Sequence, residues 1–160
     1  MSAIKSPAIL FVCLGNICRS PMAEGLLRAR AGAGGLDLVV DSAGTGDWNL
    51  GKAPDPRAQA VARRHGVDIS MLRARQVAAA DFQRFTDIFA LDAANLQDLR
   101  VLRPADATAR LSLLLDHVPG RFGQAIADPY YGDEAGFDLA WAEISGAVDA
   151  ILGALTRAQV

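Results

Sequence analysis

Short apolar runs and amphipathic stretches follow one another along this chain, which is the pattern of alternating strands and helices. The unbroken apolar run from Ala8 to Val12 has the length and composition of a fully buried strand. Apolar positions at helical spacing predict a helix from Pro21 to about Ala31, and a second strand is predicted over 36–42. A strand, a helix and a strand in this order form a βαβ unit with parallel strands.

The same alternation continues through the rest of the chain. Asp55 and Pro56 read as the N-cap and first residue of a helix that ends at His65 and Gly66. Further predicted elements are a helix over 78–84, a strand over 85–91, a helix that Asp92 caps and that runs to about Arg100, and a strand over 109–115. We therefore expect residues 1–160 to form one α/β domain with three layers, in which helices cover both faces of a twisted four-stranded parallel sheet.

The last predicted helix, from Phe137 to about Leu155, carries a single apolar stripe. Its members are Phe137, Trp141, Ile144, Val148, Ile151 and Leu155. A coiled-coil seam is the alternative, but the stripe spans fewer than three heptads and the sheet needs covering. We expect this helix to dock onto the sheet.

The loop after the first strand carries the candidate chemistry. The strand runs directly into Cys13, and Gly15 and Asn16 tolerate the positive φ of a tight loop before a helix begins near Ser20. Backbone N–H groups of such a loop, together with the helix dipole, converge on one spot. The sequence thus predicts an anion-binding loop, with a cysteine at its centre and the guanidinium of Arg19 at its rim.

The spacing of Cys13 and Arg19 points to a nucleophile aimed at phosphorus. A cysteine beside a guanidinium and a helix N-terminus is expected to be a thiolate at neutral pH. The second cysteine, Cys18, lies in the same curled loop, so a disulfide between the two is within reach. Our hypothesis is that this bond protects Cys13 from irreversible oxidation.

The run Val12-Cys13-Leu14-Gly15-Asn16-Ile17-Cys18-Arg19-Ser20-Pro21-Met22-Ala23-Glu24 resembles the active-site signature of the low-molecular-weight protein tyrosine phosphatases. The resemblance implies hydrolysis of phosphotyrosine or other aryl phosphate monoesters through a phosphocysteine, with neither metal nor other cofactor. Phosphate would be bound by the loop residues Leu14, Gly15, Asn16, Ile17, Cys18 and Arg19. Ser20 and Ser42 are the expected supporting residues, and Ser20 can hydrogen-bond the sulfur.

Two other segments resemble the family but depart from it. The stretch from Ser42 to Trp48 and the residues that follow it resemble S-A-G-T…W-H-x-G, but Asn49 stands in place of the usual His. In the segment that resembles S-x-H-R-A-R-Q, Leu72 replaces a His that helps to hold the loop asparagine. We therefore expect Asn16 to rely on Ser20, Ser42 or water, and Arg75 to be a solvated surface residue.

The Asp128-Pro129-Tyr130-Tyr131 stretch resembles the family's D-P-Y-Y motif. An ester leaving group needs a proton, and Asp128 is the candidate general acid, although Asp-Pro is also an ordinary turn signal. Tyr130 and Tyr131 are expected to line a slot for an aryl ring, with Trp48 as another wall; core packing is the alternative for all three. His65 is interpreted as a helix-end residue rather than a base.

Composition and charge bear on the binding partners and the cellular location of the protein. The net charge of −2 and pI near 5.6 give no basic field for nucleic acid. No apolar run approaches the ~20 residues of a membrane span, and the residues before the first strand lack the pattern of a signal peptide, so we expect none. We expect a monomeric cytoplasmic protein that acts on a phosphotyrosine protein, with a cognate tyrosine kinase as a further partner, or on a small aryl phosphate.

Two other functions are compatible with an anion-binding loop of this kind. Arsenate reduction on the same fold needs further thiols downstream, and no cysteine follows Cys18. A non-catalytic phosphate-binding module is expected to lose Cys13 or Asp128, and both are present. Both alternatives are therefore less favoured than the phosphatase.

Overall fold

The computed structural model describes residues 6–158. Its elements, in chain order, are β1 (Ala8–Cys13), α1 (Arg19–Ala33), β2 (Val39–Gly44), α2 (Pro56–Arg64), α3 (Asp81–Arg84), β3 (Asp87–Ala90), α4 (Ala93–Leu102), β4 (Arg110–Leu113), the 3-10 helix η1 (Leu114–His117) and α5 (Glu134–Ala158). Four strands and their connecting helices alternate in the predicted order.

The strands form one parallel sheet in the order β2-β1-β3-β4, so the predicted α/β fold is confirmed. β1 lies inside the sheet, where Phe11 is opposite Ser42 of β2 and Phe89 of β3. Every residue of β1 is buried. Because all strands are parallel, their carboxyl ends meet at one edge of the sheet, and Cys13 ends the central strand there.

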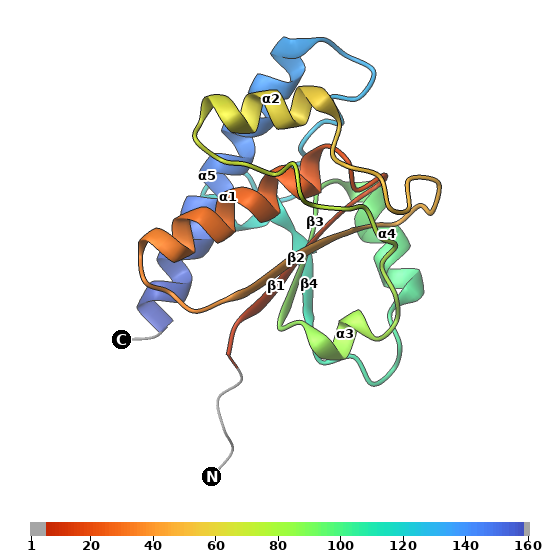
Figure 1. Ribbon diagram of the computed structural model, residues 1–160. Coiled ribbons are helices and arrows are strands. Elements are labelled where there is room, and N and C mark those ends of the chain that lie inside the picture. Colours follow the sequence, from red (N-terminus) through yellow and green to blue (C-terminus); the bar gives the residue numbers. More distant parts are fainter. Residues whose placement is uncertain (1–5, 159–160) are drawn as a thin grey trace.

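Helices cover both faces of the sheet, as Figure 1 shows. One core contains side chains of α1, α2 and α5 together with Ile9, Phe11 and Cys13 of β1. The other contains Leu10 and Val12 with residues of α3 and α4. Alternate residues of the continuous apolar run therefore serve different cores, because a strand presents successive side chains to opposite faces. This alternation directs Cys13 toward α1 and α5.

Several predicted boundaries were wrong at strand ends. The second strand is β2 at Val39–Gly44, rather than 36–42, because Leu36 N donates to Ala31 O and completes the end of α1. The last strand stops at Leu113, and the chain turns into η1, where the Asp116 carboxylate accepts from Leu113 N at 3.3 Å. β3 and α3 are likewise shorter than predicted. Apolar content marked the buried segments, but local hydrogen bonds set their ends.

The last helix, α5, docks on the sheet with α1 and α2, as predicted. Five of the six stripe residues, from Phe137 to Ile151, are buried, and Leu155 packs against the same core. By length and composition the segment Glu134–Arg157 could also cross a membrane. Its apolar stripe faces the protein core, as in the core helix of a globular domain. The expectation of no membrane span stays a prediction.

Candidate active site

The loop between β1 and α1, residues 13–19 and hereafter the phosphate loop, curls around the Cys13 sulfur. Asn16 adopts a left-handed backbone with φ of 56°, and its N–H donates to Cys13 Sγ at 3.3 Å. Its side chain is fixed on both sides: Oδ1 accepts from Arg75 N at 2.9 Å, and Nδ2 donates to the hydroxyls of Ser20 and Ser42 at 2.8 and 2.9 Å. These bonds hold a conformation that a non-glycine residue seldom adopts.

The Asn16 bonds also orient a hydroxyl toward the sulfur. Ser20 Oγ lies 2.9 Å from Cys13 Sγ and already accepts from Asn16 Nδ2. Its own hydrogen is therefore free to point at the sulfur and to donate to it. The resulting O–H···S bond places a donor on the sulfur from α1, in addition to the N–H of Asn16.

Glu24 forms the base of this network. Ser42 Oγ donates to Glu24 Oε1 at 2.6 Å, and Arg28 donates to Oε2 at 2.6 Å. Burial raises the pKa of Glu24, and the hydrogen bonds from Ser42 and Arg28 act against that rise. Because the Ser42 hydrogen is directed to Glu24, the oxygen of Ser42 is left to accept from Asn16.

Arg19 is 1% exposed, yet it lies against the cleft through a set of fixed contacts. Its Nη1 donates to Asp92 Oδ2 at 2.7 Å and to the carbonyl of Ile126 at 2.8 Å. Its Nη2 lies 3.6 Å from Asp128 Oδ2, and its buried Nε has no partner within the described residues. A guanidinium held this way has N–H groups left for an oxyanion.

Asp92 is a site residue that the sequence analysis did not identify. It caps α4 through Asn95 N at 2.8 Å with one oxygen and holds Arg19 with the other. Sequence reasoning assigned it only the capping role. Its position two residues after the end of β3 was the available signal, because polar residues at the carboxyl ends of parallel strands share one edge of the sheet.

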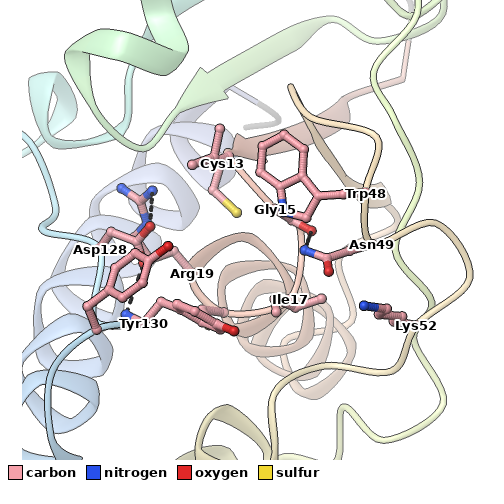
Figure 2. A pocket seen from close by; sticks show the side chains of 12 residues that line it. Cys13, Gly15, Ile17, Arg19, Trp48, Asn49, Lys52, Asp128 and Tyr130 are labelled. Atoms are coloured by element: carbon pink, nitrogen blue, oxygen red, sulfur yellow. Dashed lines mark hydrogen bonds and ion pairs between the residues drawn. The ribbon is translucent and has the colours of Figure 1, made fainter.

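Asp128, far from Cys13 in sequence, lies over the phosphate loop. A cleft of about 240 Å³ is lined by Cys13, Leu14, Gly15, Ile17, Cys18, Arg19, Trp48, Asn49, Lys52, Asp128, Tyr130 and Tyr131. Figure 2 shows Asp128 and Tyr130 on one side of the Cys13 sulfur and Trp48 on the other. The Asp128 side chain is 34% exposed, so it is open to substrate and water.

The aromatic residues form the mouth of this cleft rather than part of the core. Trp48 is 60% exposed, Tyr130 42% and Tyr131 93%. Asn49, which replaces the usual His, is buried, and its Nδ2 donates to Gly15 O at 3.1 Å. This bond attaches the Trp48 segment to the phosphate loop, so the departure from the family pattern keeps a hydrogen bond at this place.

Cys18 is buried in the phosphate loop. Burial raises the pKa of the Cys18 thiol, and the negative charges of Asp55, Cys13 and Asp128 add to the rise. Cys18 therefore stays protonated at neutral pH, and only Cys13 has the surroundings of a nucleophile.

The departure at position 72 has a structural counterpart in Arg75. The expectation that Arg75 is a solvated surface residue was wrong. Its guanidinium is half-buried and pairs with Asp41 at 3.0 Å and with Asp81 at 3.0 Å. These ion pairs fix the segment whose backbone N–H holds Asn16, while Leu72 packs against the core. Asn16 therefore has a third partner where the His is missing.

His65, the remaining candidate base, lies outside the cleft. His65 is exposed at the end of α2, and its ring stacks on Trp141 with centroids 5.0 Å apart. Among residues 6–158, no three histidines, cysteines or carboxylates come together in a way that could hold a metal ion.

Comparison with known proteins agrees with this geometry. A model of the family "low molecular weight phosphotyrosine protein phosphatase" matches residues 8–160. The low molecular weight protein-tyrosine-phosphatase of Streptomyces coelicolor is 42% identical over 95% of this chain and 94% of its own length. The crystal structure of YfkJ from Bacillus subtilis superposes with a TM-score of 0.90 at 35% identity, covering 99% of this chain and all of that one.

A Drosophila arginine phosphatase structure also matches, with a TM-score of 0.86 and 35% identity over 91% of this chain and 95% of that one. The family match spans both the phosphate loop and the segment that contains Asp128. The chain therefore belongs to the low molecular weight phosphotyrosine protein phosphatase family and is a protein tyrosine phosphatase.

Proposed function

We propose that this phosphatase cleaves aryl phosphate monoesters with Cys13 as nucleophile, Arg19 as phosphate ligand and Asp128 as general acid and base. One observation carries the proposal: the Cys13 sulfur accepts from Asn16 N and contacts the Ser20 hydroxyl at the floor of a cleft that Arg19 and Asp128 also line. Two hydrogen-bond donors at the sulfur, inside an anion-binding loop, favour a thiolate nucleophile over a cysteine with only a structural role.

In the first step the Cys13 thiolate attacks phosphorus in line and the bond to the aryl oxygen breaks. Its electron pair leaves with the phenol oxygen, which takes a proton from Asp128. The N–H groups of the phosphate loop and the guanidinium of Arg19 hold the equatorial oxygens, whose charge they stabilise in the transition state. The products are a phosphocysteine and a phenol.

In the second step water attacks the phosphocysteine, and Asp128, now ionised, takes the proton. The phosphorus–sulfur bond breaks and the electron pair returns to Cys13 as a thiolate. The Ser20 hydroxyl, 2.9 Å from the sulfur, stabilises that leaving thiolate. Inorganic phosphate is released and the enzyme is restored.

The cleft walls favour an aromatic leaving group. Trp48 and Tyr130 stand on opposite sides of the sulfur, and Ile17 adds an apolar surface between them. A flat ring fits such a slot and gains contact on both faces. Because a similar structure is that of an arginine phosphatase, phosphoarginine belongs beside phosphotyrosine and phosphoserine in the substrate assay. We expect phosphotyrosine to be hydrolysed fastest.

The Cys13→Ser variant tests the nucleophile. We expect it to lose turnover of p-nitrophenyl phosphate, because a hydroxyl is not ionised at neutral pH, and to retain binding of inorganic phosphate. Steady-state rates and a phosphate titration measure the two effects. Retained turnover would contradict the assignment, and loss of phosphate binding together with turnover would indicate a collapsed loop.

We also propose that Cys18 protects the nucleophile. Peroxide oxidises the Cys13 thiolate to a sulfenic acid and releases hydroxide, the Cys18 thiol condenses with the sulfenic acid to a disulfide with loss of water, and a dithiol reduces the disulfide. Both sulfurs line the same cleft, which supports this sequence of steps. Recovery of activity by dithiothreitol after peroxide measures it: Cys18→Ala should recover less than the parent enzyme, and equal recovery would refute the role.

We further propose that the protein is a monomer and works in the cytoplasm. Its substrates there would be proteins that a cognate tyrosine kinase has phosphorylated on tyrosine. Cys13, Arg19 and Asp128 of a single chain line the same cleft, and the proposed mechanism uses these three residues. A thiolate nucleophile also favours a reducing compartment. Sedimentation at two protein concentrations tests the monomer, and dephosphorylation of the kinase in a purified mixture tests the partner.

A further inference from the structure

The first turn of α2 lies between the phosphate loop and residues 128–132, hereafter the acid loop. Arg57 of this turn donates from Nη2 to the carbonyl of Tyr130 at 2.9 Å and from Nη1 to the carbonyl of Gly132 at 3.2 Å. Its guanidinium also lies over the ring of Tyr130 at 5.7 Å and over that of Phe137 at 4.6 Å. One side chain therefore binds both the backbone and an aromatic ring of the acid loop.

Asp55 fixes this guanidinium from the other side. Its carboxylate accepts from Arg57 Nε at 3.1 Å and from Nη2 at 3.0 Å, while it also caps α2 through Arg57 N. Burial works to raise the pKa of Asp55, but the hydrogen bonds and charge of Arg57 outweigh it and keep that pKa below its usual range. The carboxylate therefore stays ionised at neutral pH.

The same residue joins Arg57 to the phosphate loop. Asp55 N donates to the carbonyl of Ile17 at 2.8 Å. A continuous set of hydrogen bonds thus runs from Ile17 through Asp55 and Arg57 to Tyr130 and Gly132. It connects the loop that holds the nucleophile with the loop that holds the proposed acid.

The acid loop has few other polar contacts to fix its position, although Pro129 is buried. Its internal bonds are Tyr130 N to Asp128 Oδ1 at 3.1 Å and Gly132 N to Pro129 O at 3.0 Å. Within residues 6–158, the polar contacts that join it to the rest of the chain are the two from Arg57 and the longer pair between Arg19 and Asp128, 3.6 Å. Without Arg57, the pair between Arg19 and Asp128 would be the remaining polar contact between the acid loop and the rest of the described chain.

We propose that Arg57 is a positioning residue, which holds the acid loop so that Asp128 and Tyr130 face the Cys13 sulfur. This proposal rests on the proposed role of Asp128 as general acid. Arg57 does not line the cleft and so does not act on substrate directly. Four of its five N–H bonds are used in one plane, an arrangement that the single ammonium of a lysine does not reproduce.

Comparing a poor leaving group, phenyl phosphate, with a good one, p-nitrophenyl phosphate, tests the proposal. Phenol needs a proton as it leaves and p-nitrophenol hardly does, so misplacing Asp128 should lower kcat/KM mainly on phenyl phosphate. Hydrolysis of the phosphocysteine, which both substrates share, follows release of the leaving group and does not enter kcat/KM. We expect Arg57→Met to lower kcat/KM on phenyl phosphate by about tenfold to a hundredfold. The loss on p-nitrophenyl phosphate should be within about threefold, and Arg57→Lys should fall between Arg57→Met and the parent enzyme.

Asp128→Ala provides the reference. It should lose about 10²–10⁴-fold on phenyl phosphate, and adding Arg57→Met to it should cause no further selective loss, because the group that Arg57 positions is already gone. If Asp128→Ala alone shows no leaving-group selectivity, the acid role fails. If Asp128→Ala is selective but Arg57→Met lowers both substrates equally, or neither, the positioning role is overturned and the acid role stands.

Arg64→Met is the matched control. Arg64 is on the same helix and pairs with Asp138 of α5 at 2.6 Å, away from the cleft. It should leave the ratio of the two kcat/KM values unchanged, and a shift as large as that of Arg57→Met would contradict the proposal. Thermal unfolding and inhibition by inorganic phosphate verify the fold of each variant. Should Arg57→Met fail to fold, the same ratio measured on Arg57→Lys decides.

Discussion

The contacts of Asn16 show how other residues hold the phosphate loop when the His expected at position 72 is missing. Its left-handed backbone is held by Ser20, Ser42 and the N–H of Arg75, although Leu72 occupies the place of the usual His. The ion pairs of Arg75 with Asp41 and Asp81 make this N–H a fixed donor. The departure at position 72 therefore leaves the strained residue fully bonded.

Glu24, at the base of the same network, gives a prediction on stability and pH. Its pKa in the folded protein lies above its ordinary value of 4.5, so between these two values the folded state binds more protons than the unfolded state. The free energy of unfolding should therefore fall as pH rises through that window. In Glu24→Gln this contribution should be absent, while the amide oxygen still accepts from Ser42.

Urea unfolding between pH 4.5 and pH 8 measures the effect. Asp149→Asn, which removes one carboxylate from an exposed position, controls for the change in net charge. Parallel curves for the parent enzyme and Glu24→Gln would show that Glu24 contributes nothing to the pH dependence.

At the scale of elements, the close approach of β2 to the phosphate loop shapes the site. A Cβ added at Gly44, the last residue of β2, would lie 2.8 Å from the carbonyl oxygen of Leu14 and 3.2 Å from the Cβ of Asn16. Gly44 also accepts from Val77 N and donates to the carbonyl of Arg75. The end of this strand therefore packs directly against the backbone of the phosphate loop.

Gly44→Ala should displace the phosphate loop. We expect a loss of about 1–3 kcal/mol in the free energy of unfolding, because the contacted atoms belong to the backbone and cannot move aside cheaply. Affinity for inorganic phosphate should fall as well. Denaturant unfolding and phosphate inhibition measure the two.

Gly32→Ala is the control, since a Cβ there meets nothing within 4 Å. It lies near the end of α1 and should gain about 0.5–1 kcal/mol from the helix preference of alanine. Unchanged phosphate affinity in Gly44→Ala would contradict the role of this contact.

At the scale of the whole molecule, the site exists only when distant segments meet. The cleft combines residues 13–19, 48–52 and 128–131, and Asp92 and Ile126 hold Arg19 from two further segments. Two cores, one on each face of the sheet, bring these segments to the same edge. A ligand of this cleft should therefore bind the folded chain and not the unfolded one.

Inorganic phosphate should raise the unfolding temperature of the protein by this linkage. At a free concentration of a hundred times its dissociation constant, the added stability should be about 2.7 kcal/mol. Arg19→Lys should lose most of this gain, because an ammonium does not bind two phosphate oxygens as a guanidinium does.

Thermal unfolding in phosphate and in sodium chloride of equal ionic strength measures the difference. General salt effects act on both proteins alike, so Arg19→Lys isolates the contribution of the cleft. An equal rise in the two proteins would show that phosphate does not stabilise through Arg19.

The sequence by itself determined the local parts of this protein. The apolar run that ends at Cys13, the curled loop and the helix start are encoded by consecutive residues, because buried strands, positive φ and helix caps depend on neighbours in the chain. The same is true of the amphipathic stripe of α5. These features were enough to predict the parallel sheet and an anion-binding loop, while the class of reaction came from the resemblance of residues 12–24 to a known family.

Only the tertiary structure decided what surrounds that loop. Asp92 reads as a helix cap, Arg75 as a surface charge and Arg57 as an ordinary first-turn residue, yet they hold Arg19, Asn16 and the acid loop. Strand ends shifted for a different reason, since local hydrogen bonds such as that from Leu36 N to Ala31 O set them. The contacts of Asp92, Arg75 and Arg57 join residues far apart in the chain. A position at a strand end indicates the edge of the sheet at which a residue lies, but spacing along the sequence does not show which side chain it will contact.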